Sequence, residues 1–154
     1  MDARAARVAA LDALARRDYA SEDLRLKLLE KGYDKSVVSP LLDALRDEKL
    51  LDDRRYAENF VAYHAARGQG PLRIRRDLGR HGLKGPVAEE CLDAYTDWIV
   101  QLQKARQKKF GAKPPETYAD KHLQARFLGY RGFTGAQIRM ALGFDVELDS
   151  DEET

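Results

Sequence analysis

Three glycines spaced fifty residues apart constrain the fold of this chain more than any other feature. They are Gly32, Gly82 and Gly132. The residue four positions before each glycine is leucine, and the residue ten positions after each glycine is also leucine. Apolar columns at fixed offsets from one glycine indicate three copies of a unit of about fifty residues.

Each unit is predicted to form three helices. Apolar residues recur at spacings of three and four, as in helices rather than strands, and in the first unit they mark stripes over residues 8–15, 24–28 and 38–45. Ser21 is expected to cap the second helix. Gly32 fits the C′ position, where a left-handed backbone ends a helix. The predicted fold is therefore all-α, an elongated array of three tandem three-helix repeats.

These patterns divide the chain into four segments. Repeat 1 is predicted over residues 1–51, repeat 2 over residues 52–97 and repeat 3 over residues 98–144. An acidic, disordered tail is predicted over residues 145–154. Asp52, at the start of repeat 2, is placed to accept the free N–H groups of the next helix.

Two helices have less regular patterns. Pro40 falls inside the third helix of repeat 1 if that helix starts after Asp34, so a start at Ser36 or a distorted first turn is expected. In the second helix of repeat 3, Leu123 and Phe127 are expected to lie on the apolar stripe.

The near-neutral net charge conceals an asymmetry along the chain. Lys and Arg number 27 and Asp and Glu number 26, for a formal charge of +1. Residues 145–154 hold six acids and no base, so residues 1–144 carry +7. Residues 101–140 hold nine bases and two acids. A basic second half suggests a polyanionic partner.

Several function classes are disfavoured by the composition. No apolar run approaches the roughly 18 residues that span a bilayer, and the N-terminus lacks the apolar stretch of a secretory signal. Cys91 is the only cysteine, which excludes an intrachain disulfide. A cytoplasmic protein without membrane contact is expected.

The sequence holds no pattern typical of catalysis or metal binding. His64, His81 and His122 lie at no ligand spacing from one another or from Cys91, which sits in an apolar column. The chain contains no glycine-rich phosphate loop and no local signature of a catalytic triad. We therefore predict no catalytic residue, no metal site and no cofactor, and the chain is not expected to be an enzyme.

Basic residues form the candidate binding surface. In repeat 2, Arg73, Arg76 and Arg80 share one helix face, and in repeat 3 Lys104 and Lys108 form a similar row. The candidate residues are Arg67, Arg73, Arg75, Arg76, Arg80, Lys104, Lys108, Lys109, Arg126 and Arg131. Such clusters suit phosphates or carboxylates, although a solvated helix face has the same composition.

Four motifs in order resemble the RecX family of bacterial regulatory proteins. They are residues 50–57 (LLDDRRYA), 70–74 (GPLRI), 108–111 (KKFG) and 126–134 (RFLGYRGFT), and residues 10–28 also resemble the opening of the family pattern. The resemblance covers residues 4–142. The acidic extension after Gly143 is a departure that the family pattern does not require.

The resemblance implies a fold and a function. Family members consist of tandem three-helix repeats, bind the recombinase RecA on single-stranded DNA, and carry no catalysis of their own. They lie in the groove of the RecA filament or block its growth, which suppresses ATP hydrolysis, strand exchange and co-protease activity. A monomeric, cytoplasmic RecA regulator is thus expected, with Arg73, Arg76, Arg80, Lys104 and Lys108 as the favoured contact residues.

The alternative is a protein of helical repeats that binds DNA directly. Binding through phosphates would weaken steeply as salt rises, and the acidic tail would compete with DNA for the basic face. A helical adaptor for some other protein is a third interpretation.

Overall fold

The computed structural model describes residues 2–143, and the predicted acidic tail, residues 145–154, lies outside the described residues. Over residues 2–143 the chain forms helices and no strand. The helices are α1 (Ala3–Arg16), α2 (Ser21–Glu30), α3 (Lys35–Asp47), α4 (Asp53–Ala66), α5 (Pro71–Arg80), α6 (Pro86–Ala94), α7 (Trp98–Phe110), α8 (Tyr118–Tyr130) and α9 (Gly135–Leu142). The all-α prediction is confirmed.

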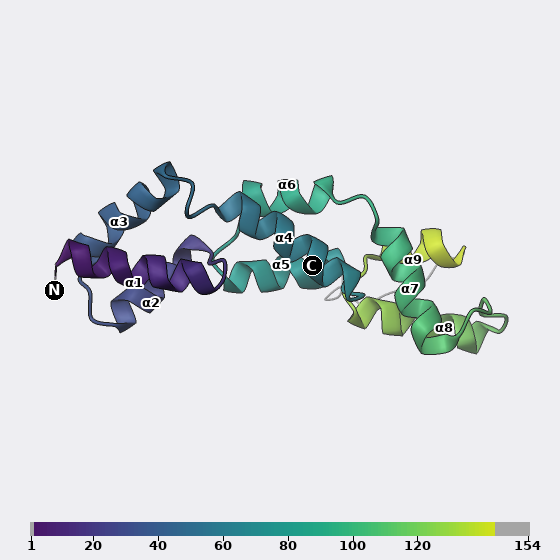
Figure 1. Cartoon of the computed structure of the whole chain (residues 1–154). Coiled ribbons are helices and arrows are strands. Elements are labelled where there is room, and N and C mark those ends of the chain that lie inside the picture. The colour runs from purple at the N-terminus through teal and green to yellow at the C-terminus, as the bar shows by residue number, and fades with distance from the viewer. Residues whose placement is uncertain (1, 144–154) are drawn as a thin grey trace.

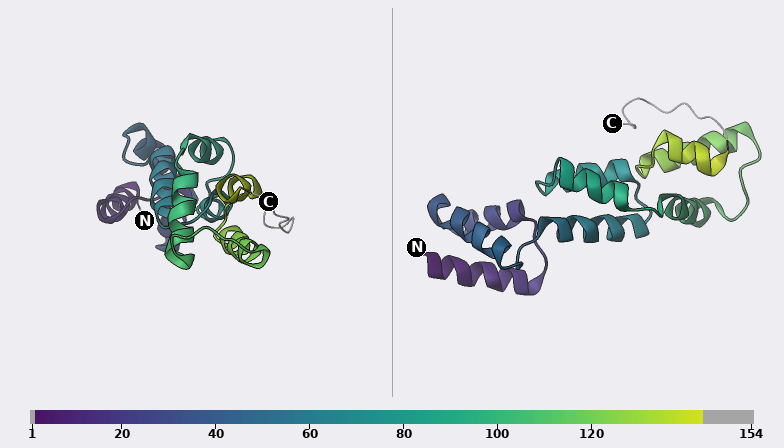
Figure 2. Two further views of the ribbon diagram at one scale, coloured as in Figure 1. Left: turned by 90° about the vertical axis from the view of Figure 1, so that its right-hand side faces the viewer. Right: turned by 90° about the horizontal axis from the view of Figure 1, so that it is seen from above.

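The helices form three groups that follow one another along the long axis of the molecule (Figures 1 and 2). Helices α1–α3, α4–α6 and α7–α9 each pack around a core of their own. Leu28, Leu78 and Leu128, the leucines four positions before the repeated glycines, are fully buried in the three cores. We refer to the three groups as repeats 1, 2 and 3.

The repeated glycines end helices in the manner that the sequence predicts. Gly32, Gly82 and Gly132 have φ values of 101°, 78° and 98°. At the first of them, the Gly32 N–H donates to the Leu29 carbonyl (2.9 Å) and the Tyr33 N–H to the Leu28 carbonyl (3.2 Å), and the other two turns repeat both bonds. This is a Schellman motif, in which the left-handed residue satisfies the last helical carbonyls.

The prediction that Ser21 caps α2 is wrong. The N-cap is Ala20, which has no side-chain cap, and Ser21 is the first helical residue. The Ser21 N–H instead donates to Oδ1 of Asp53, 2.7 Å away at the start of α4. The neighbouring Asp52 does cap α4, as predicted, by accepting the Arg55 N–H at 3.0 Å.

Helix α3 begins earlier than the Ser36 start offered as one expectation. The Asp34 carboxylate accepts the Ser36 N–H at 3.1 Å, which starts the helix at Lys35 and leaves Pro40 inside it. Capping by Asp34 supplies a partner for a free N–H group of the first turn.

The expected buried position of Leu123 in α8 is also wrong. Leu123 is 58% exposed, whereas Gln124 and Leu128 are buried. Gln124 occupies the column of Leu24 and Ile74, and its Oε1 lies 3.5 Å from a guanidinium nitrogen of buried Arg106. A hydrogen-bonded polar pair thus replaces an apolar side chain at this column, and the apolar residue beside it faces outward.

Repeats 2 and 3 meet through their backbones, at a contact that we call junction 2–3. The Gly70 N–H donates to the Arg131 carbonyl (2.7 Å), and the Leu72 N–H donates to the Gly132 carbonyl (2.9 Å). A Cβ at Gly70 would lie 2.3 Å from the carbonyl carbon of Gly132. The N-terminus of α5 therefore rests directly on the glycine turn between α8 and α9.

Repeats 1 and 2 meet in the same way at junction 1–2, but through side chains. The N-terminus of α2 rests on the turn between α5 and α6, where a Cβ at Gly82 would lie 2.6 Å from Cβ of Glu22. Asp23 Oδ2 lies 2.7 Å from Nδ1 of His81, and Asp53 accepts the Ser21 N–H as described above. Each junction joins the first turn of one helix to the glycine turn of the next repeat.

Candidate partner-binding face

An open pocket of about 450 Å³ lies between the end of α4 and helices α7 and α8, where repeats 2 and 3 meet. Its lining residues are Ala66, Arg67, Gly68, Gln101, Lys104, Ala105, Lys108, Lys109, Phe127 and Arg131. We call it the junction pocket. None of these lining residues is acidic, so its charged side chains are all cationic.

The junction pocket brings together half of the basic residues that the sequence singles out. Arg67 comes from the end of α4, Lys104, Lys108 and Lys109 from α7, and Arg131 from the end of α8. The three lysines are exposed. Arg67 and Arg131 are far apart in sequence, and they meet because junction 2–3 places the end of α4 beside the turn after α8.

Arg131 links the two repeats at this pocket. Its Nη2 donates to the Arg67 carbonyl at 2.9 Å and its Nε to the Gly68 carbonyl at 3.1 Å. These carbonyls follow α4 and lack partners within the helix, so a charged donor stabilises them. Arg131 therefore shapes the pocket as well as contributing charge to it.

Aromatic rings lie beside the cations. The Phe127 ring centroid is 5.8 Å from Cζ of Arg131 and 5.9 Å from Nζ of Lys109. The Tyr63 ring, exposed on α4, lies 4.7 Å from Cζ of Arg67. These distances are typical of cation–π contacts, which hold the long side chains near the pocket.

The arginines of α5 do not line the junction pocket, and most of them pair with acids of the same repeat. Arg75 forms a two-pronged pair with Glu89 of α6, with distances of 2.7 and 3.0 Å. Asp77 lies 4.0 Å from Arg73 and 3.4 Å from Arg80. These pairs partly neutralise the α5 row and leave Arg76 exposed outside them.

Arg126 is exposed on α8 but does not line the pocket. The candidate basic residues thus divide into the five of the junction pocket, the four of α5, and Arg126. The five of the pocket surround one hollow whose lining contains no acidic residue.

Sequence reasoning missed Tyr63 and Phe127 as parts of this face. The periodicity predicts Phe127 on the apolar stripe of its helix, whereas in the structure it is partly buried and also lines the pocket. The sequence carried no signal for this role, because Lys109 and Arg131 come to lie beside the Phe127 ring only in the folded chain. Gln101 and Ala105 carry no distinctive pattern.

The remaining candidate groups have structural roles or lack a site. Cys91 is buried in the core of repeat 2, and burial raises the pKa of its thiol, which disfavours the reactive thiolate. Among residues 2–143, no three His, Cys, Asp or Glu side chains gather as metal ligands. Within the same residues, no helix is long and apolar enough to cross a membrane.

The arrangement is suited to binding an anionic surface. Cations on a fixed helical frame, with apolar atoms between them, can contact carboxylates or phosphates together with neighbouring apolar groups. The pocket is open rather than enclosed, which suits a macromolecule better than a small molecule.

Comparisons of the sequence with known families match two of the three repeats. Residues 52–92 match the family model described as RecX, second three-helix domain, and residues 97–142 match RecX, third three-helix domain. The chain is 43% identical over 150 residues to Regulatory protein RecX of Halorhodospira halophila, covering 97% of this chain and 91% of that protein. It is 38% identical to Regulatory protein RecX of Pseudomonas entomophila, covering 92% and 93%.

Solved structures share the fold. The crystal structure of RecX from Lactobacillus salivarius matches with a TM-score of 0.81 at 22% identity, covering 92% of this chain and 94% of that chain. The elongated arrangement of three-helix groups is therefore found in an experimental structure.

Proposed function

Because this chain belongs to the RecX family of regulatory proteins, we propose that it binds the RecA filament on single-stranded DNA and suppresses the activities of RecA. These are ATP hydrolysis, strand exchange and co-protease activity. The chain acts in the cytoplasm, by binding and without catalysis or cofactor. Family membership across nearly the whole array is the observation that carries this proposal.

The junction pocket supports the proposal with a contact surface. Its five cations would lie against acidic side chains of RecA or against nearby phosphates. The molecule is elongated (Figure 1), a shape that suits lying in a groove. We assign the largest share of the contact to Lys104 and Lys108, which are exposed and act less on the fold than Arg131 does.

The test is the single-strand-DNA-dependent ATP hydrolysis of RecA, with this protein titrated from far below the RecA concentration. Inhibition at such ratios is expected. The double variant with Lys104→Glu and Lys108→Glu should require at least about tenfold more protein for half inhibition, equivalent to about 1.4 kcal/mol of binding free energy. The control, Lys35→Glu with Lys113→Glu, makes the same charge change at exposed sites outside the pocket.

Two results would contradict the proposal in different ways. No inhibition by the unaltered protein at equal concentration would overturn RecA regulation itself. Equal inhibition by both double variants would overturn only the assignment of the pocket. Tight binding to a DNA oligonucleotide without RecA, with a steep dependence on salt, would instead favour a direct DNA-binding protein.

A further inference from the structure

Helix α7 supplies three lysines to the junction pocket and contains no acidic residue. Lys104, Lys108 and Lys109 are exposed. Within residues 2–143, no salt bridge reaches any of the three. Most arginines of α5 differ in this respect, because acids of repeat 2 pair with them. The pocket lysines therefore present charges that no carboxylate of the described residues pairs with.

Helix α9 ends beside the same helix. Gln103 Nε2 donates to the Ala141 carbonyl, near the end of α9, at 3.2 Å, and Lys104 is the next residue along α7. Val100 falls between Gln103 and Lys104 around the helix axis, and it is 50% exposed. Figure 1 shows α7 and α9 together at one end of the array. The chain thus leaves α9 next to the helix that carries the pocket lysines.

The residues that follow Gly143 have a sequence suited to this surface, although they lie outside the described residues. Residues 144–149 read FDVELD, so apolar and acidic residues alternate, and residues 151–153 add three more acids. An extended chain with this alternation has its apolar side chains on one side and its carboxylates on the other. The junction pocket offers contacts for both, because Ala105 and Phe127 line it together with the cations.

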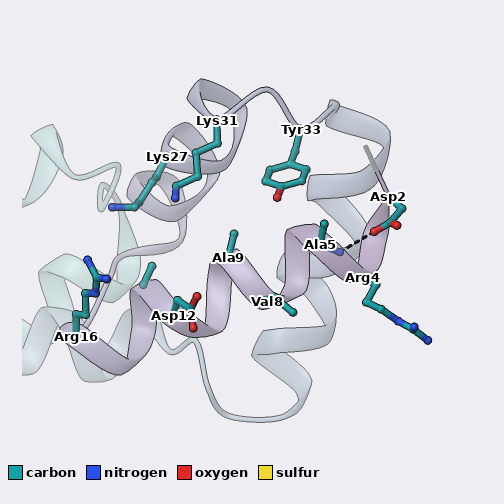
Figure 3. A pocket seen from close by; sticks show the side chains of 11 residues that line it. Asp2, Arg4, Ala5, Val8, Ala9, Asp12, Arg16, Lys27, Lys31 and Tyr33 are labelled. Carbon is teal, nitrogen blue, oxygen red and sulfur yellow. Dashed lines mark hydrogen bonds between the residues drawn. The ribbon is translucent and has the colours of Figure 1, made fainter.

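Another large hollow of the molecule suits an acidic segment less well. It has a volume of about 580 Å³ and runs along α1 (Figure 3), at the end of the array away from α9 (Figure 1). Its lining includes Asp2 and Asp12 as well as cations such as Lys27 and Lys31. Two carboxylates in the lining would repel those of the acidic tail, whereas the junction pocket has none.

The acidic tail is long enough to reach the junction pocket. Its ten residues, 145–154, span up to roughly 35 Å when extended, which is about three times the width of a helix with its side chains. The covalent link also makes the contact intramolecular, at an effective concentration on the order of millimolar. Exposed ion pairs that are weak individually therefore act together within one chain.

We propose that residues 144–154 occupy the junction pocket of their own chain and compete there with the partner. The tail carboxylates pair with Lys104 and Lys108, and the alternating apolar residues contact Val100 and Phe127. The contact within the chain is independent of the RecA proposal. Its effect on inhibition rests on that proposal, since RecA is the partner that the tail would exclude.

Carbodiimide cross-linking of the full chain tests the contact without RecA. The reagent joins a lysine amine to a carboxylate beside it as an amide, and mass spectrometry of the digested protein identifies the pair. At about 1 µM protein, cross-links from the tail should fall mainly within one chain and on Lys104, Lys108 and Lys109. Lys27 and Lys31 are the reference lysines and should react at least about fivefold less. In about 1 M salt the pocket cross-links should fall by about threefold or more, because screening weakens exposed pairs.

Inhibition of RecA ATP hydrolysis tests the competition, with two full-length variants that each lose three negative charges. The tail variant combines Asp145→Asn, Glu147→Gln and Asp149→Asn. The control combines Asp47→Asn, Glu58→Gln and Asp93→Asn, at exposed sites outside the tail. The tail variant should reach half inhibition at about threefold lower concentration or less, because its pocket is free more of the time. The control should match the unaltered chain.

The outcomes separate the two parts of the proposal. Tail cross-links spread evenly over the lysines of the chain, or found only between two chains, would overturn the contact. Equal inhibition by the tail variant and the control would overturn the competition. Absence of inhibition by the unaltered protein would contradict the RecA proposal, and the cross-linking result would still decide whether the tail occupies the pocket.

Discussion

Junctions 1–2 and 2–3 join the same two elements with different chemistry. At junction 2–3, backbone N–H groups of Gly70 and Leu72 donate to backbone carbonyls of the next repeat. At junction 1–2, the Asp53 carboxylate accepts the Ser21 N–H at the start of α2, and an Asp23–His81 pair accompanies it. Both junctions have the same turn geometry, but the hydrogen-bond acceptors are backbone carbonyls at junction 2–3 and a side-chain carboxylate at junction 1–2.

The difference shows that both repeat junctions contain the glycine turn, whereas the residue before the docking helix and its hydrogen-bond partners vary. A glycine turn with positive φ is present in both, because it lets a neighbouring helix approach. Backbone pairing additionally requires glycine at the helix end, where a Cβ at Gly70 has no room. Side-chain pairing allows Ala20 at that position but depends on ionisable groups.

The largest effect is expected from closing the space at junction 2–3. Gly132→Ala adds a Cβ 2.5 Å from Cβ of Arg73 and 2.7 Å from its backbone nitrogen, at a φ of 98°. We expect the free energy of unfolding in urea to fall by about 3 kcal/mol, from steric overlap and backbone strain together.

The control for this variant is Gly143→Ala. Its φ is 74°, and a Cβ there meets nothing within 4 Å. Gly143→Ala should lower the free energy of unfolding by about 1 kcal/mol or less, because it strains only the left-handed backbone. Equal losses in the two variants would show that the close approach of the repeats contributes nothing.

A smaller effect is expected at the side chain that supports junction 2–3. Arg131→Met removes both hydrogen bonds to the Arg67 and Gly68 carbonyls and should lower the free energy of unfolding by about 1–2 kcal/mol. Arg126→Met, an exposed site on the same helix, should change it by less than about 0.5 kcal/mol. Indistinguishable urea midpoints for the two variants would rule out a stabilising role for Arg131.

Junction 1–2 should respond to the loss of a single carboxylate. Asp53→Ala leaves the Ser21 N–H without its partner and should cost about 1 kcal/mol, a typical value for a helix cap. Asp53→Asn keeps an oxygen acceptor and should cost less. Hydrogen exchange at the Ser21 amide measures the local effect, and unchanged protection in Asp53→Ala would contradict it.

The smallest effect is a dependence of stability on pH through His64, near the end of α4. Burial lowers the pKa of His64, so the unfolded chain takes up a proton at a higher pH than the folded chain. Stability is therefore full above the ordinary histidine value of about 6.5 and falls as the pH drops through it.

This loss should be less than about 1 kcal/mol between pH 7.5 and pH 5.5 in urea unfolding. It should shrink in His64→Gln, which cannot take up a proton. A pH profile unchanged by this substitution would assign the dependence to another group. The backbone hydrogen bonds of junction 2–3 contribute nothing to this dependence of stability on pH.

Local features of the fold were predictable because single residues determine them. Gly32, Gly82 and Gly132 end helices for a steric reason that acts within a few residues. Asp52 caps α4 for an equally local reason. The prediction that Ser21 caps α2 was wrong because Ser21 is the first residue of the helix. Its N–H is satisfied by Asp53, which lies far along the chain and cannot be inferred from local sequence.

The candidate site was predictable in its residue types but not in its grouping. The basic rows of α5 and α7 follow from helical spacing. The pairing of Arg75 with Glu89 and the meeting of Arg67 with Arg131 depend on contacts between helices, which periodicity does not contain. Leu123 failed because α8 has apolar residues on two faces, and spacing alone does not say which face is buried.

The glycine turn also bears on how such a chain changes over generations. A duplicated repeat contains both the glycine turn and the helix start that form a junction. It can therefore pack against the original repeat through contacts that both already have. Lengthening or shortening by a whole unit is consequently a small step for the gene. A side chain at Gly70, by contrast, would clash with the next repeat, and one at Gly132 would clash with the preceding repeat as well as strain the backbone of its own turn.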